Sequence, residues 1–507
     1  MKKILLATLV LVSGLFYSCD KDFLETRPTD AYDESTVLST TDNLLSVING
    51  MHKNLYRQYN STQSESGMGG MYILNEFLGE DLVSAYSNGW FMAQHRWQDH
   101  RNKNGAWAKH VYEFYYMLIA NANKVLDYAD DATGSDADRN VAKGQALAYR
   151  AFSYLNLIQY YAPRYDASTA STQSGVPLLI TYTAEPQPRA TVADVYQQID
   201  TDLTNAYTLL QNYDRGSDKS QIYAITVQGL QARAALARGI YEDARDYAKA
   251  ARVAFEAAGG RLMTGSELAD RTAKTTNGFN DITNVEWIWG SKIISDQTLY
   301  FYAYHMYMAY NAGSTNVRTG PKRINSLLYA NIASTDARSY LWEPNPTTAN
   351  FPLPTTAYTR GDHMNRKFTI SSPGTTVVAD LLHMRLAEMY LIEAEARAHL
   401  GDATAATVLN QLIVTRDPGY DATTYAAAAG RTMLDEVLIQ RRIELWGEGF
   451  RFLDLKRLNL PLDRTGANFD ITVAEKMNEP AGTNEWTFHF PQSEENANPF
   501  IKDNPNP

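Results

Sequence analysis

The stretch ADLLHMRLAEMYLIEAEARAHLGD, residues 379–402, predicts a helix that ends at a glycine. Its apolar residues recur three or four apart, on one helical stripe: Leu382, Leu386, Met389, Ile392, Ala396 and Leu400. Gly401 lacks a Cβ, so it can adopt the left-handed conformation that ends a helix. Asp402 is then expected to cap a second helix over Ala403–Thr415, with Pro418 just beyond it. The stretch therefore predicts a helical hairpin.

The same pattern recurs around Gly239. Small residues occupy matching positions, with Ala232 and Ala394 seven before their glycines and Ala244 and Ala406 five after. These are the positions where two paired helices must approach closely. Two such hairpins resemble tetratricopeptide units. Because 162 residues separate the two glycines, a large insertion must lie between the hairpins.

Length and composition allow one large or two medium domains, since the chain has 507 residues and 44% apolar content. The formal net charge is −11, and no basic block or stripe occurs. This argues against nucleic acid as a partner. Tyrosine outnumbers phenylalanine 33 to 17, which favours many half-exposed aromatic positions because tyrosine combines an apolar ring with a polar tip.

Residues 1–18 are typical of a signal peptide. Lys2 and Lys3 give a charged start, and a thirteen-residue apolar run follows from Ile4 to Phe16. This run is shorter than the roughly 20 residues that a membrane-spanning helix needs. No other segment approaches that length without charges, so we expect no membrane helix in the mature chain.

Cys19 is the only cysteine, so it cannot form a disulfide within the chain. It is either a leftover thiol or the lipidation site of a bacterial lipoprotein, cleaved before Cys19 and acylated there. Phe16 and Tyr17 depart from the leucine and small residues usual before such a cysteine. Acyl chains would hold the protein on a membrane, since each buried CH₂ contributes about 0.8 kcal/mol. The polar residues 19–40 then predict an extended tether.

Several motifs follow one another along the chain. Cys19 is followed by FLE and a proline, and AKGQALAYRAFSYLNLIQYYA spans 142–162. SGVPLLI (174–180) precedes PRATVADVYQQIDTDLTNAYTLL (188–210). RIELWGEGFRFLDLKR (442–457) and FHFPQSEENANP (488–499) complete the series. In this order the motifs, together with the two hairpins, resemble the SusD/RagB family of nutrient-binding outer-membrane lipoproteins over nearly the whole chain.

The resemblance implies a mainly α, SusD-like fold with a tetratricopeptide-like scaffold of helical pairs. The scaffold is expected at about 41–60, 106–258 and 379–458, and an irregular, loop-rich ligand-binding part at about 61–105 and 260–378. Residues 41–507 would form a single domain.

The resemblance also implies a function. The protein would be a lipoprotein of the outer membrane, exposed on the cell surface and anchored through Cys19. It would capture an oligosaccharide and act as a lid for a SusC-like TonB-dependent transporter, with no chemistry on the ligand and no cofactor. The sequence leaves open whether a structural Ca²⁺ is present.

Two stretches without a clear helical pattern supply the candidate ligand-binding residues. Residues 79–107 hold three tryptophans beside amides and carboxylates, and residues 299–311 hold five tyrosines, with a strand-like alternation at 300–304. A sugar presents an apolar face and a rim of hydroxyls, so its site needs aromatic platforms beside polar groups. In the resembled family these two regions hold the ligand. The candidates are Trp90, Trp97, Asp81, Asn102, Tyr302, Tyr304, Tyr307 and Tyr310.

Other tryptophans are expected to be buried. Trp107 opens a predicted helix over Ala106–Ala129, and Trp287 and Trp289 alternate in the apolar strand pattern VEWIWGSKI. Trp342, in the proline-rich LWEPNPTTANFPLP, is a further ligand-binding candidate.

Two alternative functions remain open. A RagB-like protein would bind peptides with the same scaffold and tether. A surface glycoside hydrolase would need a carboxylate pair, for which Asp81 and Asp99 are candidates; Glu444 and Glu448 lie among arginines, which favours structural ion pairs. The sequence contains no HExxH, CxxC, P-loop, GxGxxG or GxSxG motif, and its nine histidines form no metal-binding pattern.

Overall fold

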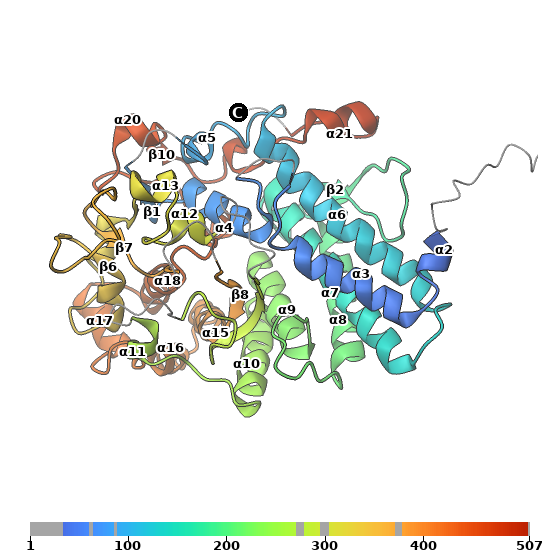
Figure 1. The fold of residues 1–507 in the computed structure, drawn as a ribbon, viewed down its shortest axis with the longest axis horizontal. Coiled ribbons are helices and arrows are strands. Elements are labelled where there is room, and N and C mark those ends of the chain that lie inside the picture. Colours follow the sequence, from blue (N-terminus) through green and yellow to red (C-terminus); the bar gives the residue numbers. More distant parts are fainter. Residues whose placement is uncertain are drawn as a thin grey trace, which may run out of the picture.

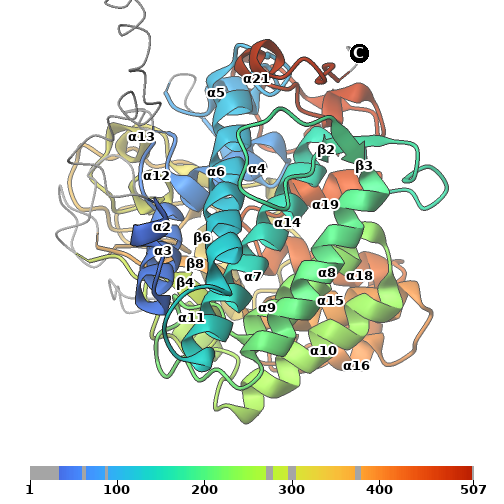
Figure 2. The same ribbon diagram turned by 90° about the vertical axis from the view of Figure 1, so that its right-hand side faces the viewer.

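A computed structural model describes residues 34–59, 64–85, 89–269, 278–294, 304–370 and 378–504. It is mainly helical (Figure 1), which confirms the predicted fold class. The long helices contact one another in succession along the chain, and Figure 2 shows several of them side by side. They are α3 (Thr41–Asn54), α6 (Ala106–Ala129), α7 (Asp136–Tyr161), α8 (Val192–Leu210), α9 (Ala224–Arg238), α10 (Tyr241–Ala257), α15 (Leu386–His399), α16 (Ala405–Ile413) and α18 (Met433–Glu444).

Both predicted hairpins are present. Gly239 ends α9 with φ +71°, and α10 packs back on α9. Gly401 has φ +69° between α15 and α16, which also pack on each other. Helix α10 contacts α15, so the two hairpins are neighbours in space despite their separation in sequence.

The helix predicted over 380–400 begins later than expected. Residues Leu381–Arg385 form strand β8, which pairs antiparallel with β4 (Trp287–Ser291), and only Leu386 onward is helical. Trp287 and Trp289 are buried in β4, as predicted. The apolar spacing was compatible with a helix, but backbone hydrogen bonds to a strand far away in sequence decided the conformation. The second helix likewise starts at Ala405, since Asp402 accepts hydrogen bonds from the backbone and hydroxyl of Thr404.

Residues 61–105 are not irregular throughout, contrary to the prediction. Gly67–Leu78 form the buried helix α4. Its glycines serve close packing: a Cβ on Gly69 would lie 2.9 Å from Cβ of Tyr304, and one on Gly70 would lie 2.7 Å from the Trp107 ring. The prediction of an irregular segment is therefore wrong over Gly67–Leu78.

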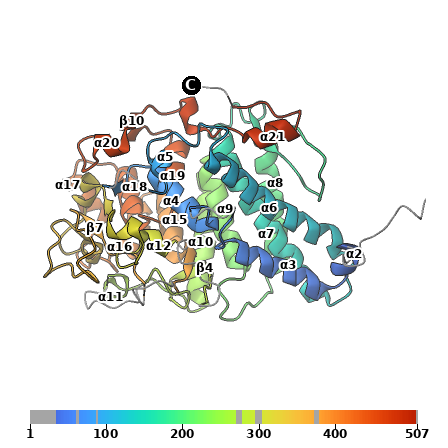
Figure 3. The ribbon, with the colours of Figure 1, turned by 45° about the horizontal axis from the view of Figure 1, so that its top comes forward.

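The insertion between the hairpins forms one end of the molecule, opposite α2 (Glu34–Val37) and α3 (Figures 1 and 3). Its sheet has the order β1-β5-β7-β6, with all described pairs antiparallel. These strands are β1 (Leu82–Ser84), β5 (Lys322–Ile324), β6 (Trp342–Glu343) and β7 (Met364–Asn365). The short helices beside them are α5 (Met92–His95), α11 (Gly265–Leu268), α12 (His305–Met308), α13 (Thr315–Arg318), α14 (Ser326–Tyr329) and the 3₁₀ helix Ala337–Leu341.

The remaining short elements lie toward the C-terminus or in a hairpin after α7. The hairpin consists of β2 (Ser174–Pro177) and β3 (Arg189–Thr191). The C-terminal elements are α17 (Ala422–Ala428), α19 (Arg451–Arg457), β9 (Leu462–Asp463), α20 (Ile471–Ala474), β10 (Asn478–Glu479), the 3₁₀ helix Asn484–Trp486 and α21 (Gln492–Ala497).

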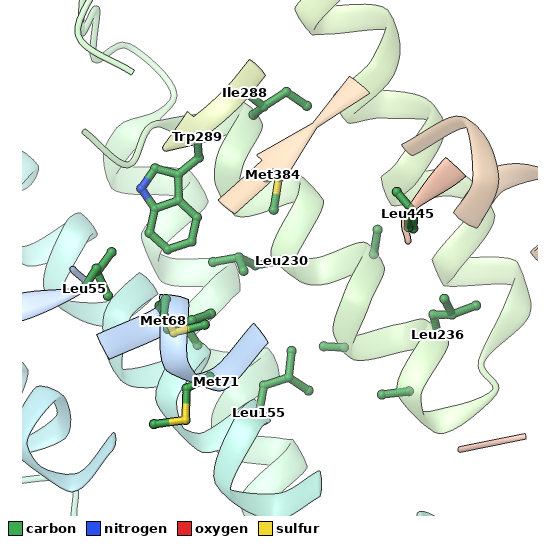
Figure 4. Packing of buried hydrophobic residues seen from close by; sticks show 14 of the residues in the cluster. Leu55, Met68, Met71, Leu155, Leu230, Leu236, Ile288, Trp289, Met384 and Leu445 are labelled. Carbon is green, nitrogen blue, oxygen red and sulfur yellow. The ribbon is translucent and has the colours of Figure 1, made fainter. Parts of the chain in front are cut away.

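The hydrophobic core continues from the helical scaffold into the insertion. Figure 4 shows Trp289 of β4 and Met384 of β8 near Leu230 of α9. Leu55, Met68, Met71 and Leu155 approach the same region from α4, α7 and the end of α3. The paired strands thus join the insertion to the scaffold.

A buried cluster of charges also joins the two parts. Glu444 contacts three arginines from separate segments: Arg385 at 2.8 Å, Arg416 at 2.8 Å and Arg338 at 3.1 Å. The cluster further includes Glu286, Asp336, Lys367 and Glu448. Burial alone would raise the pKa of Glu444, but these arginines hold it well below its usual value. These ion pairs agree with the predicted structural role of Glu444 and Glu448, although the partner residues lie outside the segment 442–457.

Candidate ligand-binding surface

A loop places Trp90 on Tyr307 of α12. Their ring centroids are 6.2 Å apart with planes 17° from parallel, and the Tyr307 hydroxyl donates to the Trp90 backbone oxygen at 2.8 Å. Tyr307 is buried, whereas Trp90 is only half-buried. The Lys322 Nζ lies 4.1 Å from the Tyr307 ring centroid. This stack puts a tryptophan at the surface on a rigid support.

A second aromatic group, the Phe351 cluster, consists of Tyr310, Tyr340, Phe351 and Arg366. The Arg366 guanidinium lies 4.3 Å from the ring centroids of both Tyr340 and Phe351. Tyr310 meets Phe351 edge-on, at 5.1 Å between centroids. Phe351 is buried, and the other three side chains are half-buried. Tyr310 lies three residues after Tyr307, just beyond the end of α12 at Met308, so a short segment of chain connects this cluster to the Trp90 stack.

The backbone near Trp90 is unusual. Phe91 has φ +67° and Trp97 has φ +58°, two of only five non-glycine residues with positive φ in the described part of the chain. Bulky residues rarely adopt this conformation, and they persist in it only where packing enforces it. Here Phe91 contacts Trp107 and Tyr307, with centroids 5.1 and 5.2 Å away. Such fixed strain often occurs where a loop positions functional side chains.

Several predicted site residues lie in the interior. Trp97 is buried, donates its indole N–H to the Leu78 oxygen at 3.0 Å, and meets Trp486 edge-on. Tyr304 is also buried, with its hydroxyl on the Gly447 oxygen. Both rings belong to the hydrophobic core.

The acidic candidates are engaged in structural contacts. Asp81 is buried against the Arg442 guanidinium at 2.6 Å. Asp99 accepts from the Trp107 backbone N–H at 2.9 Å and from Gln94 at 3.2 Å, at the start of α6. Burial raises the pKa of Asp99. Both carboxylates therefore have local partners that account for their positions.

Asn102 is exposed, and its side-chain oxygen accepts from the Asn104 backbone N–H at 3.0 Å. Tyr302 and Cys19 lie outside the described residues. Of the eight ligand-binding candidates, Trp90 and Tyr307 contact each other, and Tyr310 lies three residues beyond Tyr307, against Phe351.

Sequence reasoning did not identify Tyr340, Phe351 and Arg366. The signal that could have found them is the proline-rich stretch around Trp342, since it holds Phe351 between flanking aromatics. Trp342 itself is buried against Trp446, with centroids 5.5 Å apart.

Two classes of feature are absent from the described residues. No group of three or more His, Cys, Asp or Glu side chains in that part of the chain is arranged to hold a metal ion. None of the helices described combines the length and apolar character needed to span a bilayer.

Family models cover most of the sequence. The SusD family model matches residues 261–506, and a model described as starch-binding associating with outer membrane matches residues 22–236. No curated protein sequence matches the chain.

Solved structures are similar over nearly the whole fold. A SusD-like carbohydrate binding protein from Bacteroides vulgatus is 26% identical, with TM-score 0.74 over 91% of this chain and 97% of its own. A SusD superfamily protein from Bacteroides thetaiotaomicron is 22% identical, with TM-score 0.75 over 92% and 100%. One from Bacteroides fragilis is 18% identical, with TM-score 0.70 over 92% and 100%. The motifs, the helical pairs and these matches agree, and the chain belongs to the SusD/RagB family.

Proposed function

We propose that the protein is a cell-surface lipoprotein that binds oligosaccharides and serves as the lid of a SusC-like TonB-dependent transporter. The observation that carries the proposal is the Trp90 stack, a half-exposed tryptophan held on Tyr307 by loops outside the helical scaffold. Flat aromatic rings suit the apolar face of a sugar. The Bacteroides vulgatus relative described as carbohydrate binding supports the assignment.

Binding without chemistry is part of the proposal. Asp81 is paired with Arg442, and Glu444 is shared by arginines that keep its pKa low. This low pKa makes Glu444 a poor general acid. The lipid on Cys19 would hold the protein on the outer membrane, and the transporter would supply the energy for uptake.

The test uses the soluble chain from Asp20 onward. Glycan arrays and peptide libraries are screened first, and the affinity of each hit is measured by calorimetry. We expect oligosaccharide binding that Trp90→Ala weakens by about 1–3 kcal/mol, the cost of losing a ring at the centre of a binding site. Tyr182→Ala is the matched control, because Tyr182 is 47% exposed in the loop between β2 and β3.

Two results would replace the proposal. Tight peptide binding without any glycan signal would establish the peptide-uptake function. Release of reducing sugar that is lost in Asp99→Asn would establish a hydrolase.

A further inference from the structure

The insertion has the opposite charge balance from the rest of the chain. Residues 304–370 contain seven lysines and arginines but only three acidic residues, whereas the whole chain has 46 basic and 57 acidic residues. This is the segment that carries Tyr307, Tyr310 and the Phe351 cluster. The excess of positive charge therefore coincides with the candidate ligand-binding surface.

Four of the seven basic side chains have acidic partners. Arg338 and Lys367 belong to the buried charge cluster. Arg323 pairs with Asp362, and Arg366 lies 3.4 Å from Glu343. These four charges are compensated within the protein.

Arg318 and Arg360 have no carboxylate within ion-pair distance among the described residues. The Arg318 Nη2 donates only to the Thr315 hydroxyl, at 3.3 Å. The Nε of Arg318 is buried and has no hydrogen-bond partner among the described residues. Arg360 donates to the Phe351 backbone oxygen, at 3.1 and 3.3 Å. Both side chains are half-buried. They therefore bear positive charge that the described chain neither neutralises nor fully exposes to water.

The two arginines lie in neighbouring loops beside the Phe351 cluster. The Thr359 backbone N–H donates to the Arg318 backbone oxygen at 2.6 Å, which joins the two loops. Arg360 binds Phe351 directly, and Tyr358 reaches the Asn311 oxygen at 3.4 Å, next to Tyr310. Aromatic rings and uncompensated guanidinium groups thus share one part of the surface.

Lys322 adds a third basic group without an acidic partner in the described chain. Its Nζ donates to the backbone oxygens of Gly320 at 2.7 Å and Asn316 at 3.2 Å, and lies over the Tyr307 ring. Lys322 is buried, and this burial lowers its pKa to about 7, so at neutral pH it adds only part of a positive charge beneath the Trp90 stack.

We propose that the ligand is an anionic glycan, whose carboxylate or sulfate groups pair with Arg318 and Arg360 while its sugar rings contact Trp90 and the Phe351 cluster. Guanidinium groups bind both kinds of anion through paired N–H donors. The proposal rests on the proposed glycan-binding function and names the class of glycan.

The test compares matched polysaccharides on the soluble chain. Polygalacturonate is paired with its fully methyl-esterified form, and dextran sulfate with dextran. Binding is measured by affinity electrophoresis and calorimetry. We expect the charged member of at least one pair to bind at least tenfold more tightly, with affinity falling between about 50 and about 500 mM NaCl. Preference for polygalacturonate identifies a carboxylate ligand, and preference for dextran sulfate identifies a sulfate ligand.

The variant Arg318→Gln/Arg360→Gln should lose about tenfold or more of this affinity, since hydrogen bonds between charged groups are the stronger ones. Arg245→Gln/Arg261→Gln is the matched control, because it removes two arginines that are paired with Asp246 and Glu267 and lie outside residues 304–370. The control should bind like the parent chain. Trp90→Ala should also weaken binding. Binding of a polyanion to a purely electrostatic patch would not depend on Trp90.

The outcomes separate this inference from the proposed function. Equal or tighter binding of the neutral member in both pairs overturns the anionic-glycan inference and leaves glycan binding intact. The inference is also overturned if the two double variants lose affinity equally, or if Trp90→Ala leaves the affinity unchanged. Absence of binding to every glycan, neutral or charged, overturns the proposed function as well.

Discussion

Glu444 shows how much a single residue contributes when it is buried among opposite charges. Its carboxylate contacts Arg338, Arg385 and Arg416 from three segments. Glu444→Gln removes the shared negative charge but leaves the guanidinium groups buried. We expect the free energy of unfolding in urea to fall by about 3–5 kcal/mol, as when one partner is removed from a buried ion pair. Glu113→Gln, which loses an exposed 3.6 Å contact with Lys109, should change it by less than about 1 kcal/mol; equal effects would contradict the assignment.

Residue type predicted the positions of some aromatic side chains and not others. Trp107, Trp287 and Trp289 are buried as expected, because local helix and strand patterns indicated which faces they occupy. Trp97 was placed at the ligand, but Trp486 and Phe452, far away in sequence, enclose it. The proline-rich stretch marks the region of Phe351, but the packing of Arg366 against Tyr340 and Phe351 could not be anticipated, since no periodic pattern relates these three residues.

At the scale of helices and strands, glycine substitutions separate backbone conformation from packing. A Cβ on Gly401 would meet nothing within 4 Å, but its φ of +69° is unfavourable for other residues. Gly401→Ala should therefore lower the free energy of unfolding by about 1–2 kcal/mol. A Cβ on Gly50 in α3 would also meet nothing within 4 Å, and Gly50 has no positive φ. Gly50→Ala should therefore raise the free energy of unfolding by about 0.5–1 kcal/mol. Chemical denaturation measures both, and changes of the same sign would refute this account.

The helical hairpins could be predicted because their signals are local. A glycine after an amphipathic stretch, with small residues at fixed distances, defines each of them. Strand β8 could not be predicted in the same way, because its pairing partner β4 lies almost a hundred residues earlier in the chain. Helix α4 was missed for a related reason: its glycines pack against Tyr304 and Trp107, and neither contact is visible in the local sequence.

For the whole molecule, the arrangement separates a helical scaffold from a loop-rich end. The scaffold places α3, α6, α7 and α8 in succession, and the insertion with β6 and β7 lies at the other end (Figures 1 and 3). The paired strands β4 and β8 and the Glu444 cluster connect the two parts. The charge balance of residues 304–370 can be counted from the sequence, whereas the structure is needed to show which of these charges have carboxylate partners.

Membrane attachment is the prediction that concerns the entire protein. None of the described helices could span a bilayer, and Cys19 follows a signal-peptide-like segment. We expect the intact protein to incorporate labelled palmitate and to fractionate with the outer membrane. Cys19→Ala should abolish labelling and release the protein into the soluble fraction, because acyl chains supply the hydrophobic free energy of attachment. The glycan affinity should be unchanged, since the residues of the proposed binding surface lie between Trp90 and Arg366. Membrane retention of the unlabelled variant would mean that protein contacts, and not a lipid, hold it there.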